Sequence, residues 1–328
     1  MSVFQATPEN IARAADVLRA GGLVGMPTET VYGLAADALN PAAVRGIFAA
    51  KGRPADHPLI VHLPSANHLP QWASAIPKDA IALAAAFWPG PLTLILRRNA
   101  DVPDEVTGGQ DTVGLRVPGH PVALALLRAF DSGIAAPSAN RFGRISPTTA
   151  QHVVEELGDK VGVVLDGGAC EVGIESTILD LSRDTPVLLR PGAISADAIA
   201  AVIGRRPRQR EEEQGDTPRV SGALAAHYAP RTPLVLVSAE RLAAELAGRS
   251  GRIAVLARSV APQTAFHWHT APQDPPGYAH DLYASLRTLD ALGADLILLE
   301  APPPTPEWQA VSDRLGRAAT GSGESDEP

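Results

Sequence analysis

Short apolar runs alternate with capped helical stretches over the first 204 residues, and this alternation constrains the fold more than any other feature of the sequence. One such strand-and-helix pair begins with the apolar run 23–26. Its helix follows Asn40, a common N-cap residue, and has Pro41 at its first position. Alternating strands and helices predict an α/β fold. Because the intervals are irregular, the pattern favours a mixed sheet over a purely parallel one.

The same pattern predicts the other elements of this region. Strands are expected at 58–63, 92–96, 112–118, 134–136, 161–165, 176–181 and 187–189. Helices are expected at 7–20, 65–73, 78–88, 121–130, 146–157 and 195–203. Thr7 is placed to cap the first helix, and Ser146 is placed to cap the fifth.

Composition divides the chain into an α/β domain at 1–204, a linker at 205–231, a smaller α/β domain at 232–318 and a tail at 319–328. The linker has clustered charges, Pro and Gly without apolar periodicity. The smaller domain has predicted strands at 234–237, 253–257 and 296–300 and a helix at 279–292. It lacks the glycine spacing of a dinucleotide loop, so a Rossmann-like shape there would not imply NAD. The polar tail is expected to be disordered.

The composition narrows the possible functions. With 45% apolar residues, 328 residues are enough for two cores, and no apolar run is long enough to cross a bilayer, so we expect a cytoplasmic protein without membrane contact. Cys170 is the only cysteine, which excludes internal disulfides and thiolate-rich zinc sites. An inert thiol explains it better than a nucleophile, since no His lies near it in sequence. The net charge of −8 opposes strong nucleic-acid binding, although a local basic cleft could hold a nucleotide.

Two cations follow the Asn40 helix on a glycine-flanked loop. Lys51 and Arg53 repel each other by about 1 kcal/mol when screened by water, so their spacing suits a polyanion such as a phosphate chain. Two solvated surface charges would explain the same residues.

Polar residues on two apolar strands are further candidates. Arg116 interrupts an apolar strand, and leaving it buried without a partner would cost several kcal/mol, so it is a candidate for binding a carboxylate or phosphate. His62 ends another apolar strand, where either a ligand contact or a satisfied core histidine would account for it.

The segment after the 134–136 strand offers a hydroxyl and an amide. Ser138 and Asn140 alternate with small residues that would let a ligand approach the backbone, although turn chemistry also explains them. The expected helix cap is a sufficient role for Ser146, but an anion could also bind at that helix N-terminus.

Six motifs then carry a resemblance. They are PTETVYGL at 27–34, KGRP at 51–54, PLIVH at 58–62, WPGPLT at 88–93, APSAN at 136–140 and EST at 175–177. In this order they resemble the YrdC-like family, and together with the second domain they are similar to its two-domain threonylcarbamoyl-AMP synthases. The resemblance implies a YrdC-like twisted mixed sheet with flanking helices and a smaller C-terminal Rossmann-like domain.

The resemblance implies a nucleotidyltransferase reaction in tRNA processing. L-threonine, bicarbonate and ATP, with Mg²⁺ accompanying the ATP, would give threonylcarbamoyl-AMP and pyrophosphate. Downstream tRNA threonylcarbamoyltransferase proteins would then use the product to make threonylcarbamoyladenosine.

Site roles also follow from matching motif positions. The positions that match ATP-binding residues are Lys51, Arg53, His57, Thr112, Ser138, Asn140, Ser146, Arg190 and Tyr228. Those that match threonine-binding residues are Thr30, His62, Arg116, Ala136 through its backbone, and Ser176. No protein nucleophile and no protein metal ligand are implied. Lys51 and Arg53 would neutralise phosphate charge.

The expected chemistry needs positioning more than a reactive side chain. An N-carboxylate attacking the α-phosphorus requires in-line placement and neutralised charge. Because a carbamate and a mixed anhydride decompose in water, the site should close, and Tyr228 in the linker is the expected lid residue. Residues 220–226 depart from the family, since they lack the usual Pro before Gly and the usual basic residue before His227.

Two other functions agree with parts of the sequence. A carbamoyltransferase of the hydrogenase-maturation type shares the YrdC-like unit, but the single cysteine excludes the zinc-finger segments that such proteins resemble. A module binding double-stranded or ribosomal RNA would use a basic cleft. The acidic balance and the 4% aromatic content argue against it.

Overall fold

The computed structural model describes residues 2–213, 217–259 and 267–323. The chain forms two compact units, of which the first comprises Met1–Phe142 and Pro147–Ala223 and the second comprises Gly143–Ser146 and Leu224–Pro328. The second unit thus includes a four-residue piece from the middle of the first. Among the described helices, none combines the length and hydropathy that a membrane crossing requires.

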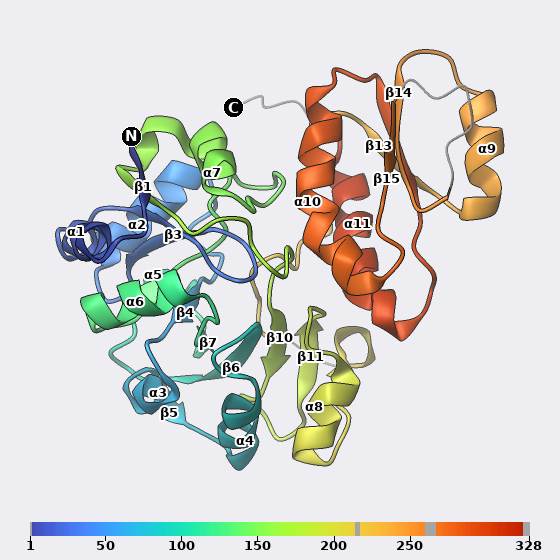
Figure 1. Cartoon of the computed structure of the whole chain (residues 1–328). Helices are drawn as coiled ribbons and strands as arrows, with labels where there is room; N and C mark the ends of the chain where they lie inside the picture. The colour runs from blue at the N-terminus through green and yellow to red at the C-terminus, as the bar shows by residue number, and fades with distance from the viewer. Residues whose placement is uncertain (1, 214–216, 260–266, 324–328) are drawn as a thin grey trace. The chain divides into compact units, whose positions relative to one another are not determined.

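The first unit is built on one mixed sheet of twelve strands, counted over the described residues (Figure 1). Its strands are β1 (Ser2–Gln5), β2 (Val24–Met26), β3 (Gly33–Asp37), β4 (Ile60–His62), β5 (Ala73–Ala75), β6 (Leu92–Arg98), β7 (Thr112–Arg116), β8 (Ile134–Ala135), β9 (Val163–Asp166), β10 (Thr177–Asp180), β11 (Val187–Arg190) and β12 (Arg208–Gln209). The strand order is β1-β9-β2-β3-β8-β4-β7-β6-β10-β11-β12, with β5 paired to β6.

Parallel and antiparallel pairs both occur, which confirms the mixed α/β prediction. The pairs β1/β9, β9/β2, β4/β7, β6/β10 and β11/β12 are parallel, and the others are antiparallel. The helices are α1 (Pro8–Arg19), α2 (Pro41–Lys51), α3 (Leu69–Trp72), α4 (Lys78–Phe87), α5 (Asp104–Thr107), α6 (Pro121–Phe130), α7 (Ala150–Leu157) and α8 (Ala196–Ile203), with 3₁₀ turns η1 (Ala66–His68), η2 (Gly158–Lys160) and η3 (Arg210–Glu212).

The two faces of this sheet carry separate cores. Alternate side chains of a strand point to opposite faces, and on β3 Ala35 joins the core beneath α1 and α6 while Leu34 and Ala36 join the larger core that includes α2 and α4. Both cores rely on small residues, which lets the helices approach the sheet closely.

Local signals place α2 as the sequence predicts. The Asn40 side chain accepts hydrogen bonds from the N–H groups of Ala42 and Ala43, and Gly52 ends the helix in the left-handed conformation. Lys51 is therefore the last helical residue, and Arg53 leads away on the following loop.

The second unit is a small parallel sheet covered on both faces. Its elements are β13 (Leu234–Val237), α9 (Ala239–Ala247), β14 (Ile253–Ala257), β15 (His267–Thr270), α10 (Pro275–Ala291), β16 (Leu296–Glu300), η4 (Pro306–Trp308) and α11 (Gln309–Gly321). The strand order is β13-β16-β14-β15. Helices α10 and α11 cover one face and α9 covers the other (Figure 1), as in a Rossmann-like layout.

Several boundaries differ from the predictions. Ser146 does not cap α7, because the helix begins three residues after Pro147 and the Thr149 hydroxyl accepts the hydrogen bond from the His152 N–H. Strand β12 and turn η3 lie in the predicted linker, and the described linker residues up to Ala223 pack with the first unit. Residues 319–321 end α11 instead of starting a tail, while the expected disorder at 324–328 falls outside the described residues.

We expect Gly192→Ala to lower the free energy of unfolding by about 1–3 kcal/mol, because an added Cβ would lie 2.4 Å from the Thr177 nitrogen and 2.8 Å from the carbonyl carbon of Ser176. Urea denaturation would measure the loss. Gly162→Ala is the matched control, since its Cβ would meet no atom within 4 Å. Equal stability of the two variants would contradict the packing argument.

Candidate active site

The segment between β2 and β3 forms a buried polar turn. The Thr28 hydroxyl donates to the carbonyl oxygen of Val31 at 2.6 Å and accepts from the N–H groups of Thr30 and Val31 at 3.2 Å. This local network satisfies a turn that has almost no exposed side chain. It fixes Glu29 and Thr30 at the end of β2, where both side chains are buried.

Three residues surround Arg116, namely Glu29, Thr30 and His62. We call these four residues the arginine cluster. The Arg116 guanidinium donates to the Thr30 hydroxyl at 3.0 Å and to the carbonyl oxygen of Gly90 at 3.2 Å. Its Nη2 lies 2.6 Å from Glu29 Oε1, and both side chains are less than 8% exposed. The anion that the sequence required for Arg116 is thus supplied, in this structure, by the protein itself.

His62 completes the cluster from the neighbouring strand. It is paired with Arg116 in the register of the parallel strands β4 and β7, so both side chains end their strands at the same edge. Burial first and the Arg116 charge second lower the pKa of His62 to about 3. The imidazole is therefore neutral near pH 7, and its Nδ1 has no hydrogen-bond partner among the described residues.

Lys51 is the centre of a second group, the lysine cluster, with Ser138 and Asn140. Its Nζ donates to the carbonyl oxygens of Ser138 at 2.6 Å and Asn140 at 2.5 Å. Burial and then the charge of Arg53 lower the pKa of Lys51 well below its usual value. These bonds confirm that Lys51 is not a solvated surface charge.

The segment that follows β8 is held against the polar turn. Leu34 donates its N–H to the carbonyl oxygen of Pro137, and the Ala139 N–H donates to that of Tyr32. The Ala136 N–H donates to the carbonyl oxygen of Ile60, next to the His62 strand end. The backbone of 136–140 therefore runs between the arginine cluster and the lysine cluster.

Arg53 and Arg190 meet at Ser221. Arg53 donates to the Ser221 hydroxyl at 2.9 Å, and Arg190 donates to the Ser221 carbonyl oxygen at 2.8 Å. Arg190 also donates to the carbonyl oxygen of Ser176 at 2.9 Å and to its hydroxyl at 3.2 Å. Two of the cations that the sequence assigns to ATP are thus bonded to a linker residue.

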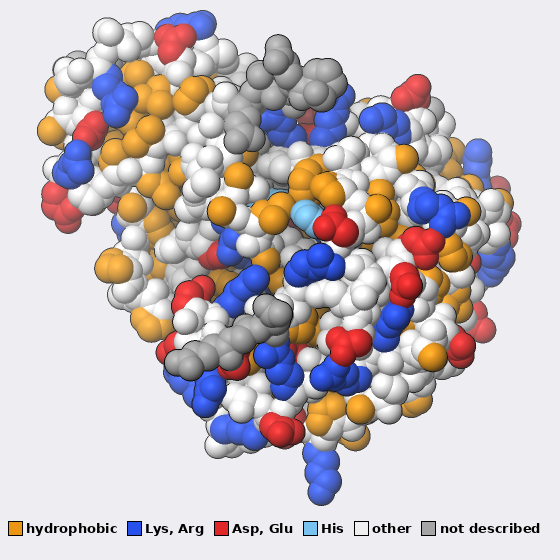
Figure 2. Space-filling model, turned by 180° about the vertical axis from the view of Figure 1, so that it is seen from behind, with side chains coloured by type: hydrophobic (Ala, Val, Ile, Leu, Met, Phe, Trp, Pro, Cys, Tyr) orange, Lys and Arg blue, Asp and Glu red, His pale blue; other side chains and the backbone are white. Residues whose placement is uncertain are grey.

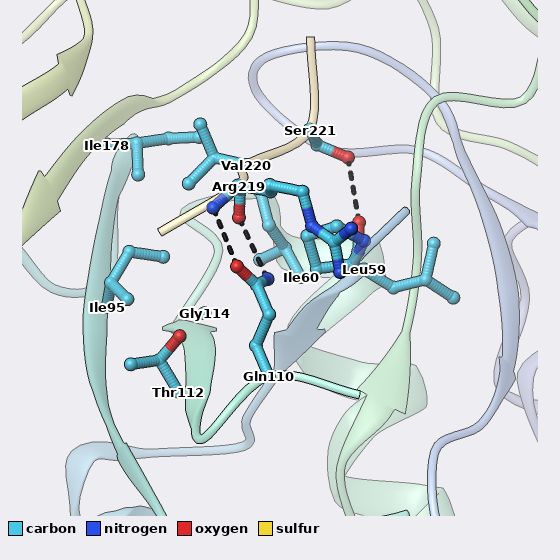
Figure 3. A pocket seen from close by; sticks show the side chains of 11 residues that line it. Leu59, Ile60, Ile95, Gln110, Thr112, Gly114, Ile178, Arg219, Val220 and Ser221 are labelled. Carbon is cyan, nitrogen blue, oxygen red and sulfur yellow. Dashed lines mark hydrogen bonds between the residues drawn. The ribbon is translucent and has the colours of Figure 1, made fainter. Parts of the chain in front are cut away.

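Residues 219–221 form a strap across the first unit (Figure 3). The strap is fastened by Gln110, which exchanges two hydrogen bonds with the Arg219 backbone, and by Val220, which packs with Ile178 and other apolar side chains. A pocket beside the strap is lined by Pro58, Leu59, Ile60, Ile95, Gln110, Thr112, Gly114, Ile178, Arg219, Val220 and Ser221. Thr112, a predicted nucleotide contact, lies in this lining.

Ser176 connects Arg190 with Thr93, a neighbour of the arginine cluster. Its hydroxyl is 2.8 Å from that of Thr93 on β6, and Thr93 and Arg116 adjoin the paired residues Leu94 and Leu115 of neighbouring strands. The predicted threonine ligands Thr30, His62, Arg116 and Ser176 therefore share one edge of the sheet with Arg190.

His57 lies near Arg53, and its ring centroid is 5.4 Å from that of Phe142. Partial burial first and the charge of Arg53 second lower the pKa of His57. Its predicted nucleotide contact stays a prediction.

Ser146 and Tyr228 belong to the second unit. Tyr228 is buried at a positive φ of 63°, and its ring packs within that unit against His227 and Tyr283 and beneath the Arg314 guanidinium. Their predicted nucleotide contacts, and the role of Tyr228 as a lid, stay predictions.

Sequence reasoning missed three polar residues of the site, Glu29, Thr93 and Ser221. Glu29 and Thr93 lie inside motifs noted for other residues, and a carboxylate between two threonines just after an apolar run was a usable signal for Glu29. Ser221 carried none, because its partners are 168 and 31 residues away in the chain.

Cys170 is buried against the arginine cluster. Burial first and the Glu29 charge second raise its pKa to about 12, so the thiol stays protonated, in agreement with the inert role that its sequence context favours.

The arrangement suits a small molecule with a carboxylate and a phosphate chain. An Arg supplies bidentate binding to a carboxylate, and buried cations attract phosphates strongly in a site of low dielectric. On the face drawn in Figure 2, Lys and Arg side chains alternate with Asp and Glu side chains, a pattern that does not favour a nucleic-acid backbone there.

Comparisons with known proteins bear directly on this site. A Sua5/YciO/YrdC model, described as "Telomere recombination", matches residues 16–192, and a model described as "Threonylcarbamoyl-AMP synthase, C-terminal domain" matches residues 194–320. The chain belongs to the Sua5/YciO/YrdC family. The family model accounts for the six motifs and their order, which lie within residues 16–192. The second model accounts for most of the C-terminal unit.

Individual relatives match nearly the whole chain. The threonylcarbamoyl-AMP synthase of Pyrococcus abyssi is 41% identical over 318 residues, which cover 93% of each protein. That of Bacillus subtilis is 41% identical and covers 95% of this chain and 93% of its own. The crystal structure of P. abyssi Sua5 complexed with L-threonine is 38% identical, covers 98% of both chains and has a TM-score of 0.91.

We expect His62 to make the free energy of unfolding fall between about pH 6.5 and pH 3. The unfolded chain binds a proton near pH 6.5 while the folded protein resists it down to about pH 3, so acid favours unfolding in this window. In the His62→Gln variant, the fall in the free energy of unfolding across this pH window should be smaller by up to roughly 4 kcal/mol.

Urea denaturation at a series of pH values would measure the effect, and His68→Gln controls for removing a histidine from the same unit. Parallel curves for wild type and His62→Gln would contradict it.

Proposed function

We propose that this protein is an L-threonylcarbamoyladenylate synthase. It would convert L-threonine, bicarbonate and ATP into threonylcarbamoyl-AMP and pyrophosphate, and would therefore act as a nucleotidyltransferase. One observation carries the proposal. Arg116, which is suited to a carboxylate, and the buried cations of a phosphate site lie at the same edge of the sheet. The names of the relatives and the threonine-bound structure support the same assignment.

The family position favours this reaction over the carbamoyltransferase alternative. The model that matches residues 194–320 is described as the C-terminal domain of threonylcarbamoyl-AMP synthase, and most of the second unit lies in these residues. A protein with the YrdC-like unit alone would not have this second unit.

The proposed reaction has two steps. The amino group of threonine combines with bicarbonate to give a carbamate and water, and a carbamate oxygen then attacks the α-phosphorus of ATP while pyrophosphate leaves. Neither step needs a protein nucleophile. Arg116 would hold the threonine carboxylate, His62 would remain neutral beside it, and the lysine cluster with Arg53 and Arg190 would hold the phosphates.

Nucleotide binding would be an exchange at two of these cations. Arg53 and Arg190 bond to Ser221 of the strap, so phosphate oxygens would replace the Ser221 hydroxyl and carbonyl. Ionised acceptors make stronger hydrogen bonds than these neutral ones, which gives the exchange its direction.

Magnesium is proposed to accompany the ATP. The described residues contain no group of three or more His, Cys, Asp or Glu side chains able to hold a metal, and Glu29 is paired with Arg116. Phosphate oxygens and water, which Mg²⁺ commonly uses, would therefore be its ligands. When bound, the ion would neutralise phosphate charge.

The cellular setting is proposed from the reaction. The product would pass in the cytoplasm to tRNA threonylcarbamoyltransferase proteins, because a mixed anhydride must be consumed before water destroys it.

Purified protein should release pyrophosphate from ATP only when threonine and bicarbonate are both present, because the attacking oxygen comes from the carbamate that these two form. A coupled phosphate assay, with each co-substrate omitted in turn, would measure this. Release without threonine would overturn the proposed substrate.

Lys51→Ala should lower kcat for pyrophosphate release by about 100-fold or more, since it removes a buried cation from the phosphate site. Lys160→Ala is the matched control, because Lys160 also donates to a backbone carbonyl, that of Ala50, but lies on the exposed side of the helix end. Equal rates in the two variants would remove Lys51 from the phosphate site.

A further inference from the structure

Glu29 is a buried carboxylate, and its ion pair with Arg116 does not by itself explain what it does in the reaction. Its side chain is 7% exposed, and neither oxygen accepts a hydrogen bond from any described residue. The Nη2 of Arg116 is at ion-pair distance from Oε1 but lacks hydrogen-bond direction. Orphaned buried acceptors of this kind are rare and call for a missing donor.

The charges of the arginine cluster define what that donor can be. Glu29 contributes one negative charge and Arg116 one positive charge, while His62 is neutral. A ligand whose carboxylate takes the guanidinium leaves Glu29 without its counter-ion, and an unpaired buried charge is strongly destabilising. A ligand that also carries a cation restores the balance.

An α-amino acid meets this requirement. It is a zwitterion, and its ammonium group has up to three N–H donors for the Glu29 carboxylate oxygens. The backbone of Gly119 packs against the Glu29 carboxyl group, because a Cβ added at Gly119 would lie 3.4 Å from it.

We propose that Glu29 binds the ammonium group of threonine and selects α-amino acids over other hydroxy carboxylates. Arg116 and Glu29 bind each other in the empty site and take the two opposite charges of the substrate when it arrives. This assignment rests on the proposed function and names the group that orients the amine before it is carboxylated.

Calorimetric titration provides the test, with L-threonine and its analogue that has a hydroxyl in place of the amino group. The wild-type protein should bind threonine about 10- to 100-fold more tightly than the analogue. In Glu29→Gln this ratio should fall to within about threefold, because a neutral amide gains nothing from the ammonium charge. Glu29→Asp, which keeps the charge, should retain most of the preference.

A control separates selectivity from stability. Glu300 of the second unit is also buried and pairs with Arg258 at 2.9 Å, so Glu300→Gln breaks a comparable ion pair. It should lose stability yet keep the wild-type preference. A Glu29→Gln protein that discriminates as well as wild type would overturn the proposal.

The proposal can also fail on the wild-type protein alone. If that protein binds the deaminated analogue as tightly as threonine, Glu29 does not recognise the ammonium group, whatever the variants do. Pyrophosphate release that still requires threonine would then show that the inference fails while the proposed function stands.

Discussion

The bonds from Lys51 to two backbone carbonyls hold the site together. A primary ammonium at the end of α2 is buried, and it is tolerated because the carbonyl oxygens of Ser138 and Asn140 replace its water. The C-terminal end of a helix also favours a positive charge. This one interaction ties a helix end to the segment after β8. That segment in turn bonds to Tyr32 and Leu34, so the Lys51 bonds connect the end of α2 with the start of β3.

Local sequence predicted the elements that carry their own signals. Caps at Thr7 and Asn40 marked the starts of α1 and α2, and the apolar runs marked β4, β7, β13, β14 and β16. Strand β1 was missed because its four residues are mostly exposed at the sheet edge, and β15 because it alternates two histidines with Trp and Thr. Helices α9 and α11 also carry signals of this kind, such as Leu242 with Leu246 on α9.

The site was less predictable than the fold because its contacts are distant in sequence. The apolar strand around Arg116 could indicate that this residue needed an anion. Only the fold shows that Glu29 supplies the anion from another strand end. Arg53 and Arg190 were assigned to the nucleotide by motif, whereas the strap that bonds to them was expected to belong to a linker without apolar periodicity. Residues with strong local preferences were thus placed correctly, and those whose role depends on a partner far along the chain were not.

The second unit contains residues 143–146, and this limits how the protein can be divided. The Gly143 carbonyl oxygen accepts from the Ala229 N–H, and Arg287 donates to the carbonyl oxygen of Ile145. A chain cut after Ala223 would keep this loop but remove every partner just named. The polypeptide passes between the two units three times, so removing the C-terminal unit would leave residues 143–146 without these bonds.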